Sequence, residues 1–178
     1  MLEKVKEYAK KKHKNVNQKY DDFDYEYHLN MVYEVAKKFI HLIEKKEQEN
    51  VLAACWVHDI IEDARETYND VKNETNETIA ELAYALTNEK GRTRKDRAND
   101  TYYKGIRETK NASFIKICDR IANVKYSKST GSRMFDAYRK ENENFISKIY
   151  VPECEEMVMH LNSIFNESQV SANRQIVY

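Results

Sequence analysis

The sequence predicts an all-α protein. Its 178 residues include only three glycines and one proline, so few positions are suited to tight turns. Charged residues make up 34% of the chain, and apolar residues recur between them at the three- and four-residue spacing of amphipathic helices. No stretch alternates apolar and polar residues over more than a few positions, so the strand signal is weak. The length predicts one domain over 1–178, with a core at about 18–165.

The composition argues against several classes of protein. Lys plus Arg and Asp plus Glu each number 30, so the overall charge gives no reason to expect nucleic acid or an anionic membrane as a partner. The sequence has no apolar signal-peptide region and no run of ~18 apolar residues that would span a membrane. The cysteines Cys55, Cys118 and Cys154 are widely spaced in apolar segments. We therefore expect reduced core thiols in a cytoplasmic protein.

Two amphipathic helices are expected first. Residues 1–20 are rich in lysine with apolar residues at helical spacing, and His13 in this run is expected at the surface. The acidic residues at 21–24 are expected to form a loop that caps the next helix. That helix, at about 26–46, has an apolar stripe with a 3.6-residue period, and His28 lies on the stripe. Taken alone, such a histidine is typical of a hydrogen-bonded core residue.

The stretch VLAACWVHDIIED, at 51–63, is the most informative part of the sequence. It is apolar almost without interruption, which predicts one helix buried on most of its circumference. Its polar residues are His58, Asp59, Glu62 and Asp63, and their spacing would place them on one helical face. Because unpaired buried charges are costly, a bound cation is the simplest partner for this face. The alternative is that the face lies in water at the end of the helix.

A loop and a further helix are expected next. Residues 64–76 are polar, and Thr75 or Asn76 can cap a helix at about 77–87. The densest basic cluster then comprises Arg92, Arg94, Lys95 and Arg97. This cluster could be a solvated face, or it could receive an anionic substrate, because guanidinium groups bind phosphate oxygens in bidentate fashion.

A second apolar helix with an inward carboxylate is predicted at 112–127. Asp119 interrupts its apolar run, with Lys116 three residues before it and Asn123 one turn after it on the same face. A single Asp in a core helix is rare without a partner.

The rest of the chain predicts a flexible loop and two helices. The loop is expected at 127–133 and the helices at 134–150 and 152–165, with a polar tail after Asn166. Pro152 suits the first turn of the last helix, where its missing N–H is harmless.

Four inward polar residues are candidate metal ligands: His28, His58, Asp59 and Asp119. Two imidazoles and two carboxylates suit a hard or borderline divalent ion, and Mn²⁺, Fe²⁺, Co²⁺ and Zn²⁺ are all compatible with them. In this order and on these helices, the four residues resemble the signature of the HD-domain metal-dependent phosphohydrolases. HDIIED is similar to the HDxxED motif of the stringent-response synthetase/hydrolases and small alarmone hydrolases, and KICDRIANV is similar to their KLADRxxN segment. Tyr25 also matches a tyrosine of that family, and the similarity covers about 18–128.

The resemblance implies an HD-type helical bundle that removes pyrophosphate from the 3′ position of (p)ppGpp, with Mn²⁺ as the most expected metal. By this resemblance the four candidate ligands would hold the metal, and Glu62 and Asp63 would orient and deprotonate the attacking water. Asn123 would contact the substrate or its ribose. The remaining residues expected at the substrate are Tyr25, Arg92, Arg94, Lys95, Asn99, Lys116 and Arg120. The expected partner is a small-molecule nucleotide, with no nucleic acid or membrane.

The sequence departs from the family pattern around the expected substrate. NQKYDDFDY replaces the family's Arg-Lys/Ser loop, Leu29 replaces a proline, and the arginine-rich segment replaces an acidic-asparagine element, in which Asn99 is expected to occupy a similar place. One alternative is therefore an HD-superfamily nucleotidase or nucleoside polyphosphate hydrolase with another nucleotide substrate. A non-catalytic metal-binding module is a second, but the Glu62–Asp63 pair argues against it. A nucleic-acid binder is a third, but the neutral net charge and the lack of an aromatic stacking pattern do not favour it.

Overall fold

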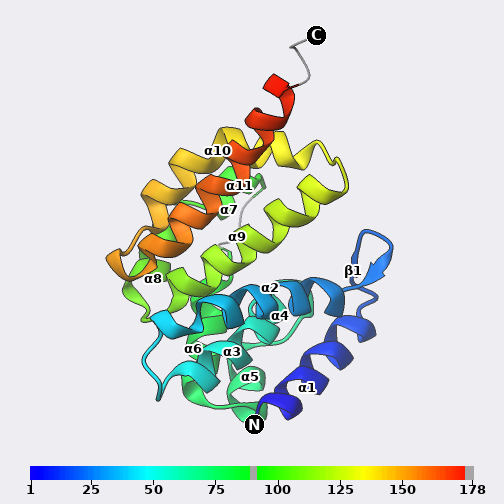
Figure 1. Cartoon of the computed structure of the whole chain (residues 1–178). Coiled ribbons are helices and arrows are strands. Elements are labelled where there is room, and N and C mark those ends of the chain that lie inside the picture. Colours follow the sequence, from blue (N-terminus) through cyan, green and yellow to red (C-terminus); the bar gives the residue numbers. More distant parts are fainter. Residues whose placement is uncertain (89–91, 175–178) are drawn as a thin grey trace.

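The computed structural model confirms the all-α class (Figure 1). It describes residues 1–88 and 92–174, without the side chains of residues 94, 95 and 168–174. The α-helices are α1 (Leu2–Asn15), α2 (Glu26–Phe39), α3 (Gln48–Val57), α4 (Ile60–Asp63), α5 (Tyr68–Glu74), α6 (Glu77–Leu86), α7 (Arg94–Arg97), α8 (Asp100–Glu108), α9 (Ala112–Ser129), α10 (Met134–Ile149) and α11 (Glu155–Arg174). Two 3₁₀ turns, η1 (Ile40–Leu42) and η2 (Pro152–Cys154), and a short hairpin of β1 (Lys19–Tyr20) and β2 (Phe23–Asp24) complete the described elements.

The helix α9 lies between two groups of helices. In Figure 1, α1 to α6 lie on one side of it and α10 and α11 lie on the other. It packs against α2 on the first side and against α10 and α11 on the second. The apolar side of α2 supplies Leu29, Val32 and Ala36, all fully buried, to the core. The α2–α9 pair therefore forms the middle of the core, and it also carries two of the candidate metal ligands.

The expected single helix over 51–63 is wrong. The helix α3 ends at Val57, a turn contains His58 and Asp59, and α4 begins at Ile60. The hydrogen bond from Asp63 N–H to the Asp59 carbonyl, 2.8 Å, closes the single turn of α4. No glycine or proline marks this turn in the sequence, so tertiary contacts of the two side chains must favour it.

The expected acidic capping loop at 21–24 is also wrong. This segment forms the antiparallel β1–β2 hairpin, in which Lys19 pairs with Asp24 and the two side chains form an ion pair. The residue that precedes α2 is Tyr25, and its side chain makes no capping hydrogen bond within the described chain. The hairpin instead brings aromatic side chains over the start of α2.

Several other helix limits differ from the expectations. The segment expected as a loop at 64–76 contains α5, which begins with a capping box between Thr67 and Asp70. The helix at 26–46 ends at Phe39 and continues as η1, and the last helix runs beyond 165 to Arg174. The Asn76 cap on α6 is confirmed, because its side chain accepts a hydrogen bond from the Ile79 amide, 2.9 Å.

The burial pattern confirms one prediction about side chains and corrects another. The three cysteines are buried and free, as expected for core thiols. His13 was expected at the surface, but it is only 1% exposed, because α1 turns this residue toward the rest of the protein. Among the described residues, no helix is both long enough and apolar enough to cross a membrane.

Two substitutions on α11 test how this helix packs. Leu161 is fully buried, whereas Met159, two residues earlier, is 64% exposed. We expect Leu161→Ala to lower the free energy of unfolding by about 2–5 kcal/mol, because the truncation leaves a cavity. Met159→Ala should change it by less than about 0.5 kcal/mol. Urea denaturation followed by circular dichroism measures both values, and equal effects would contradict this packing.

Candidate metal centre

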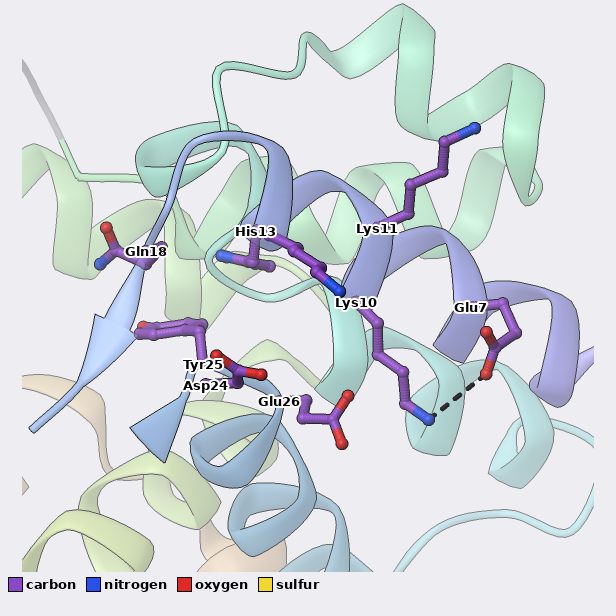
Figure 2. A pocket seen from close by; sticks show the side chains of 9 residues that line it. Glu7, Lys10, Lys11, His13, Gln18, Asp24, Tyr25 and Glu26 are labelled. Carbon is purple, nitrogen blue, oxygen red and sulfur yellow. Dashed lines mark hydrogen bonds and ion pairs between the residues drawn. The ribbon is translucent and has the colours of Figure 1, made fainter. Parts of the chain in front are cut away.

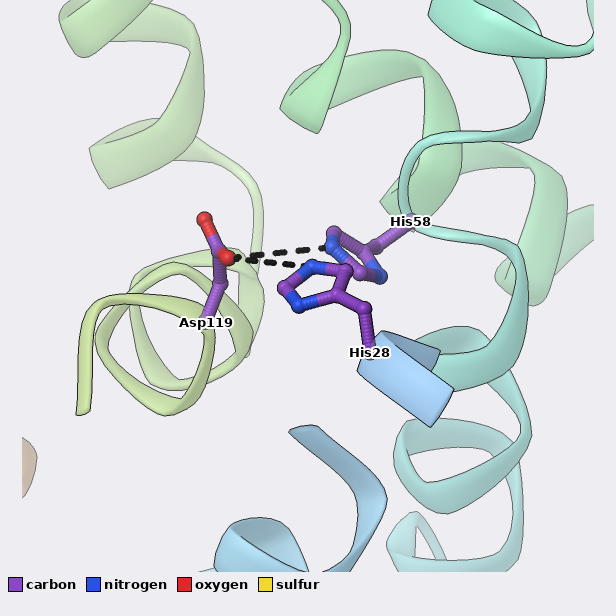
Figure 3. A group of neighbouring side chains, drawn as sticks. All are labelled: His28, His58 and Asp119. Carbon is purple, nitrogen blue, oxygen red and sulfur yellow. Dashed lines mark ion pairs between the residues drawn. The ribbon is translucent and has the colours of Figure 1, made fainter. Parts of the chain in front are cut away.

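Three side chains from separate elements converge on one point (Figure 3). His28 comes from α2, His58 from the end of α3, and Asp119 from the middle of α9. Each offers one ligand atom, and these three atoms all lie within 4.8 Å of one another. His28 Nε2 lies 3.4 Å from Asp119 Oδ1, and His58 Nε2 lies 4.0 Å from the same oxygen. All three side chains are buried or nearly so.

The fourth candidate ligand, Asp59, lies beside the same histidines. Its Oδ2 is 2.9 Å from His58 Nε2 and 3.6 Å from His28 Nε2. The turn between α3 and α4 allows the adjacent residues His58 and Asp59 to reach the same point, which successive positions of a regular helix would not do. The structure therefore brings together all four residues that the sequence singles out as candidate ligands.

The ring of His58 is held in the orientation that a metal ligand needs. Its Nδ1 lies 2.9 Å from the Cys55 carbonyl oxygen, which can only accept a hydrogen bond. Nδ1 therefore carries the proton and leaves Nε2 free to face the carboxylates. Nε2 is buried and has no properly directed hydrogen bond among the described residues. A cation between Nε2 and the carboxylates would satisfy this nitrogen.

The charges at the site are strongly coupled. Burial acts to lower the pKa of His28, but hydrogen bonds to Asp119 and Asp59 outweigh burial and raise it to about 9. Burial acts to raise the pKa of Asp59, but the adjacent His58 and His28 hold it well below its usual value. Burial likewise opposes ionisation of Asp119, but Lys116 and the histidines lower its pKa. In the metal-free protein, protons on basic groups balance the two carboxylates, and a divalent cation would replace some of those protons.

Neighbouring side chains orient the two carboxylates. The Tyr25 hydroxyl donates to Asp59 Oδ2 at 2.6 Å. Lys116 Nζ lies 3.0 Å from Asp119 Oδ2, and the amide of Asn123 donates to Asp119 Oδ1. Contacts of this kind fix ligand geometry around metal sites and are needed for full metal affinity.

The hairpin adds Tyr20, which the sequence analysis did not identify. Its ring stacks on His28 with the ring centres 4.8 Å apart, and its hydroxyl donates to Asn123 Oδ1 at 2.7 Å. Tyr20 is 103 positions from Asn123 in the chain, so no local pattern could have revealed this contact. Asn123, which was expected at the substrate, accepts this hydrogen bond through its side-chain oxygen.

Glu62 and Asp63, the predicted catalytic pair, make different contacts. The Asn88 side-chain amide donates to both Glu62 carboxylate oxygens at 2.8 Å, and Arg97 Nη1 lies 3.9 Å from Glu62 Oε1. Asp63 turns toward the hairpin side, where Tyr25 donates to it at 3.3 Å and Gln18 at 3.4 Å. The two members of the predicted catalytic pair therefore have different hydrogen-bond partners. Asn88 was not identified from the sequence.

Asp63 has an unusual protonation equilibrium. Burial, together with the nearby charges of Asp59 and Glu62, raises the pKa of Asp63 to about 6. The Tyr25 hydroxyl lies between Asp59 and Asp63 and contacts both. Asp63 is thus separated from a candidate ligand by one hydroxyl group, and its pKa is close to neutral pH.

The basic residues expected at the substrate lie in different environments. Arg92 is exposed, and the side chains of Arg94 and Lys95 lie outside the described residues. The Asn99 side chain caps α8 by accepting from the Tyr102 amide at 3.0 Å.

Arg120 lies on the side of α9 that faces α10. Its guanidinium is 4.0 Å from the ring centre of Phe145 and 4.6 Å from that of Tyr138, and it lies 3.6 Å from Glu141. Adjacent helical positions diverge in direction, which explains why Arg120 does not share the environment of Asp119. Packing between α9 and α10 accounts for this buried arginine.

A cavity of about 410 Å³ lies behind Tyr25 (Figure 2). His13 lines it and stacks on the Tyr25 ring, with the ring centres 4.5 Å apart. Burial lowers the pKa of His13 to about 4, so the imidazole is neutral. Neither ring nitrogen has a hydrogen-bond partner in the part of the chain that the structure describes. Tyr25 lines this cavity and also donates the hydrogen bond that orients Asp59.

Comparisons with known proteins add no family assignment, because no family model and no curated protein matches this chain. The fold and the site define an all-α protein with a cluster of two histidines and an aspartate that could hold a metal ion. Any finer assignment rests on the chemistry of the residues.

Removing one hydroxyl tests the role of Tyr25. We expect Tyr25→Phe to weaken Mn²⁺ binding about 10- to 100-fold, because Asp59 loses the hydrogen bond that orients it. Tyr27→Phe is the matched control, since Tyr27 is 40% exposed and lies two residues away. Isothermal titration calorimetry gives both affinities. Unchanged binding in Tyr25→Phe would show that the hydroxyl does not support a ligand.

The pKa of Asp63 has a consequence for stability. A carboxyl with a raised pKa holds its proton more tightly in the folded state, so stability decreases as pH rises from about 4 to about 6. We expect Asp63→Asn to make the metal-free protein more resistant to urea at pH 7, with the difference disappearing near pH 4. Parallel pH profiles for the two proteins would contradict the raised pKa.

Proposed function

We propose that the protein is a metal-dependent phosphohydrolase that acts on a nucleotide, with (p)ppGpp the first substrate to test. The observation that supports this proposal best is the convergence of ligand atoms from His28, His58 and Asp119, with Asp59 beside both imidazoles. The same residues carry the resemblance to the HD-domain phosphohydrolases. An HD-type bundle is part of the same proposal.

The donor set suits a divalent ion that retains open coordination positions. Two imidazole nitrogens and two carboxylates would hold Mn²⁺, or alternatively Fe²⁺, Co²⁺ or Zn²⁺. When bound, such an ion supplies a water of lowered pKa and polarises a phosphoryl oxygen. The free Nε2 of His58 and the oriented carboxylates of Asp59 and Asp119 fit this role.

Proton transfer is assigned to Asp63 and Glu62. A carboxylate whose pKa is close to the working pH is an effective general base, and the pKa of Asp63 is about 6. The Tyr25 hydroxyl, which contacts both Asp63 and Asp59, can pass a proton between them. Glu62 is held by two hydrogen bonds from Asn88, so its carboxylate is positioned to orient a water.

Positive side chains would receive the phosphate groups. Lys116 is largely buried beside Asp119, where its charge can stabilise negative charge that develops on a leaving phosphate. The side chain of Arg97 lies 3.9 Å from Glu62. The candidates for binding the distal phosphates are its neighbours in the chain, Arg92, Arg94 and Lys95. This segment would contact the nucleotide from the side of Glu62.

The hairpin favours a second candidate substrate class. In place of the family's Arg-Lys/Ser loop, Tyr20 stacks on His28 and holds Asn123. Because these side chains over the candidate ligands differ from those of the family, they suit a substrate with a different base or a different arrangement of phosphates. A nucleotidase or nucleoside polyphosphate hydrolase with the same four ligands is therefore the alternative.

Metal analysis of the purified protein, combined with a nucleotide panel, tests the proposal. We expect a bound divalent metal and release of phosphate or pyrophosphate from one member of a panel of (p)ppGpp, dNMPs, dNTPs and cyclic nucleotides. Asp59→Ala should lose both metal and hydrolysis while its helical circular dichroism signal remains.

Asp136→Ala is the control, because Asp136 is exposed and pairs only with Arg139 in the described chain. Full activity in Asp59→Ala would disprove the assignment. Bound metal without hydrolysis of any nucleotide would instead favour a non-catalytic metal-binding module.

A further inference from the structure

The candidate metal centre is almost completely enclosed by the protein. The side chains of His28 and His58 are only 3% and 1% exposed, and those of Asp59 and Asp119 are 17% and 13% exposed. A phosphate group that binds a metal at this point needs a wider opening than these side chains leave. Part of the protein must therefore move before a substrate can reach the centre, as lids do in many enzymes.

The β1–β2 hairpin, at residues 19–24, is the covering element with the fewest buried contacts. In Figure 1 it projects at the edge of the helical bundle. Its strands have two residues each, and Tyr20 is the only residue of 19–24 that is not exposed. A segment that buries so little of its surface can separate from the protein at a small cost in free energy.

Tyr20 is the contact through which the hairpin covers the centre. Its ring stacks on the ring of His28, and its hydroxyl donates to Asn123 Oδ1. The docked hairpin therefore shields one candidate ligand and occupies an oxygen that was expected to face a substrate. A substrate hydroxyl and the hydroxyl of Tyr20 would compete for this same acceptor.

A second contact holds the hairpin against α9. The hydroxyl of Tyr126 donates to Asp21 Oδ2 at 2.8 Å, and the ring of Tyr126 lies edge-on to Tyr20 with the ring centres 4.9 Å apart. Asp21 is exposed and Tyr126 is half-buried. Neither residue is a candidate ligand, so this hydrogen bond can be removed without altering the side chains that would bind a metal.

We propose that residues 19–24 form a lid over the candidate metal centre. The lid opens when Tyr20 separates from His28 and Asn123, and the hydrogen bond between Tyr126 and Asp21 holds it closed. Opening exposes the candidate ligands and frees the oxygen of Asn123 for a substrate. The admission of a nucleotide rests on the proposed function, whereas the movement of the hairpin does not.

Fluorine nuclear magnetic resonance of the metal-free full chain tests the movement. A 3-fluorotyrosine at position 20 reports the closed form, and the urea-unfolded chain gives the signal of a free ring. Saturation transfer between the two forms measures the open fraction. We expect Tyr126→Phe to increase this fraction about 3- to 10-fold, because a hydrogen bond to the hairpin is lost.

Tyr150→Phe is the matched control. The hydroxyl of Tyr150 also donates to a carboxylate, Glu155 Oε2 at 2.6 Å, but this pair lies outside the hairpin and α9. The open fraction should therefore stay unchanged. The lid is disproved if no open form is detected in any of these proteins, or if Tyr126→Phe and Tyr150→Phe have the same open fraction.

A double-mutant cycle identifies the bond that holds the lid. Asp21→Ala should increase the open fraction about as much as Tyr126→Phe does. The double variant should add little to either single change, because both remove the same interaction. Fully additive effects would contradict the assigned role of this hydrogen bond.

Rates of Co²⁺ binding distinguish a lid from a support for the ligands. Visible absorption follows the association of Co²⁺ with the protein and its release into excess EDTA. Tyr126→Phe should accelerate both steps equally, about 3- to 10-fold, and leave the affinity unchanged, because the lid closes over the empty and the occupied centre alike. Weaker affinity with an unchanged association rate would overturn the lid.

The outcome is separable from that of the proposed function. A hairpin that opens as expected, in a protein that hydrolyses no nucleotide, supports the lid and counts against the phosphohydrolase. Hydrolysis by a protein whose hairpin shows no open form refutes the lid alone.

Discussion

Two largely buried carboxylates, facing two imidazoles, are the constraint on which the rest of the structure depends. Such charges are tolerated only when opposite charges and hydrogen-bond donors surround them. Here the balance comes from His28 and Lys116, and the orientation comes from Tyr25 and Asn123. Because these groups belong to α2, α9 and the segment before α2, the requirement for charge balance links elements that are distant in sequence.

The turn at His58–Asp59 interrupts the helical periodicity of its four polar residues. A continuous helix would have aligned them on one face, whereas in the structure they have different partners. His58 and Asp59 contact each other at the candidate metal centre. Glu62 accepts hydrogen bonds from Asn88, and Asp63 accepts them from Tyr25 and Gln18. The four side chains are therefore held by contacts with several other elements and not by the periodicity of one helix.

Tyr25 and α9 connect this centre to its surroundings. Tyr25 contacts Asp59 through its hydroxyl and stacks on His13 through its ring, so the cavity of Figure 2 and the candidate centre share one side chain. The helix α9 carries Asp119 near its middle, where it meets α2, and it packs against α10 and α11 on its other side. Tyr25 and Asp119 are both largely buried, so these contacts lie in the interior of the protein.

The sequence by itself determined the all-α class, the cap of α6, the apolar faces of helices such as α6 and α9, and the four candidate ligands. These features depend on local periodicity and on the cost of placing polar residues in apolar helices. Tertiary structure alone decided that His13 is buried, that Tyr20 covers His28, that Asn88 holds Glu62, and that Arg120 packs against Phe145. Each of these arrangements is a contact between residues far apart in the chain, and helical periodicity gives the face of a residue but not its partner on another element.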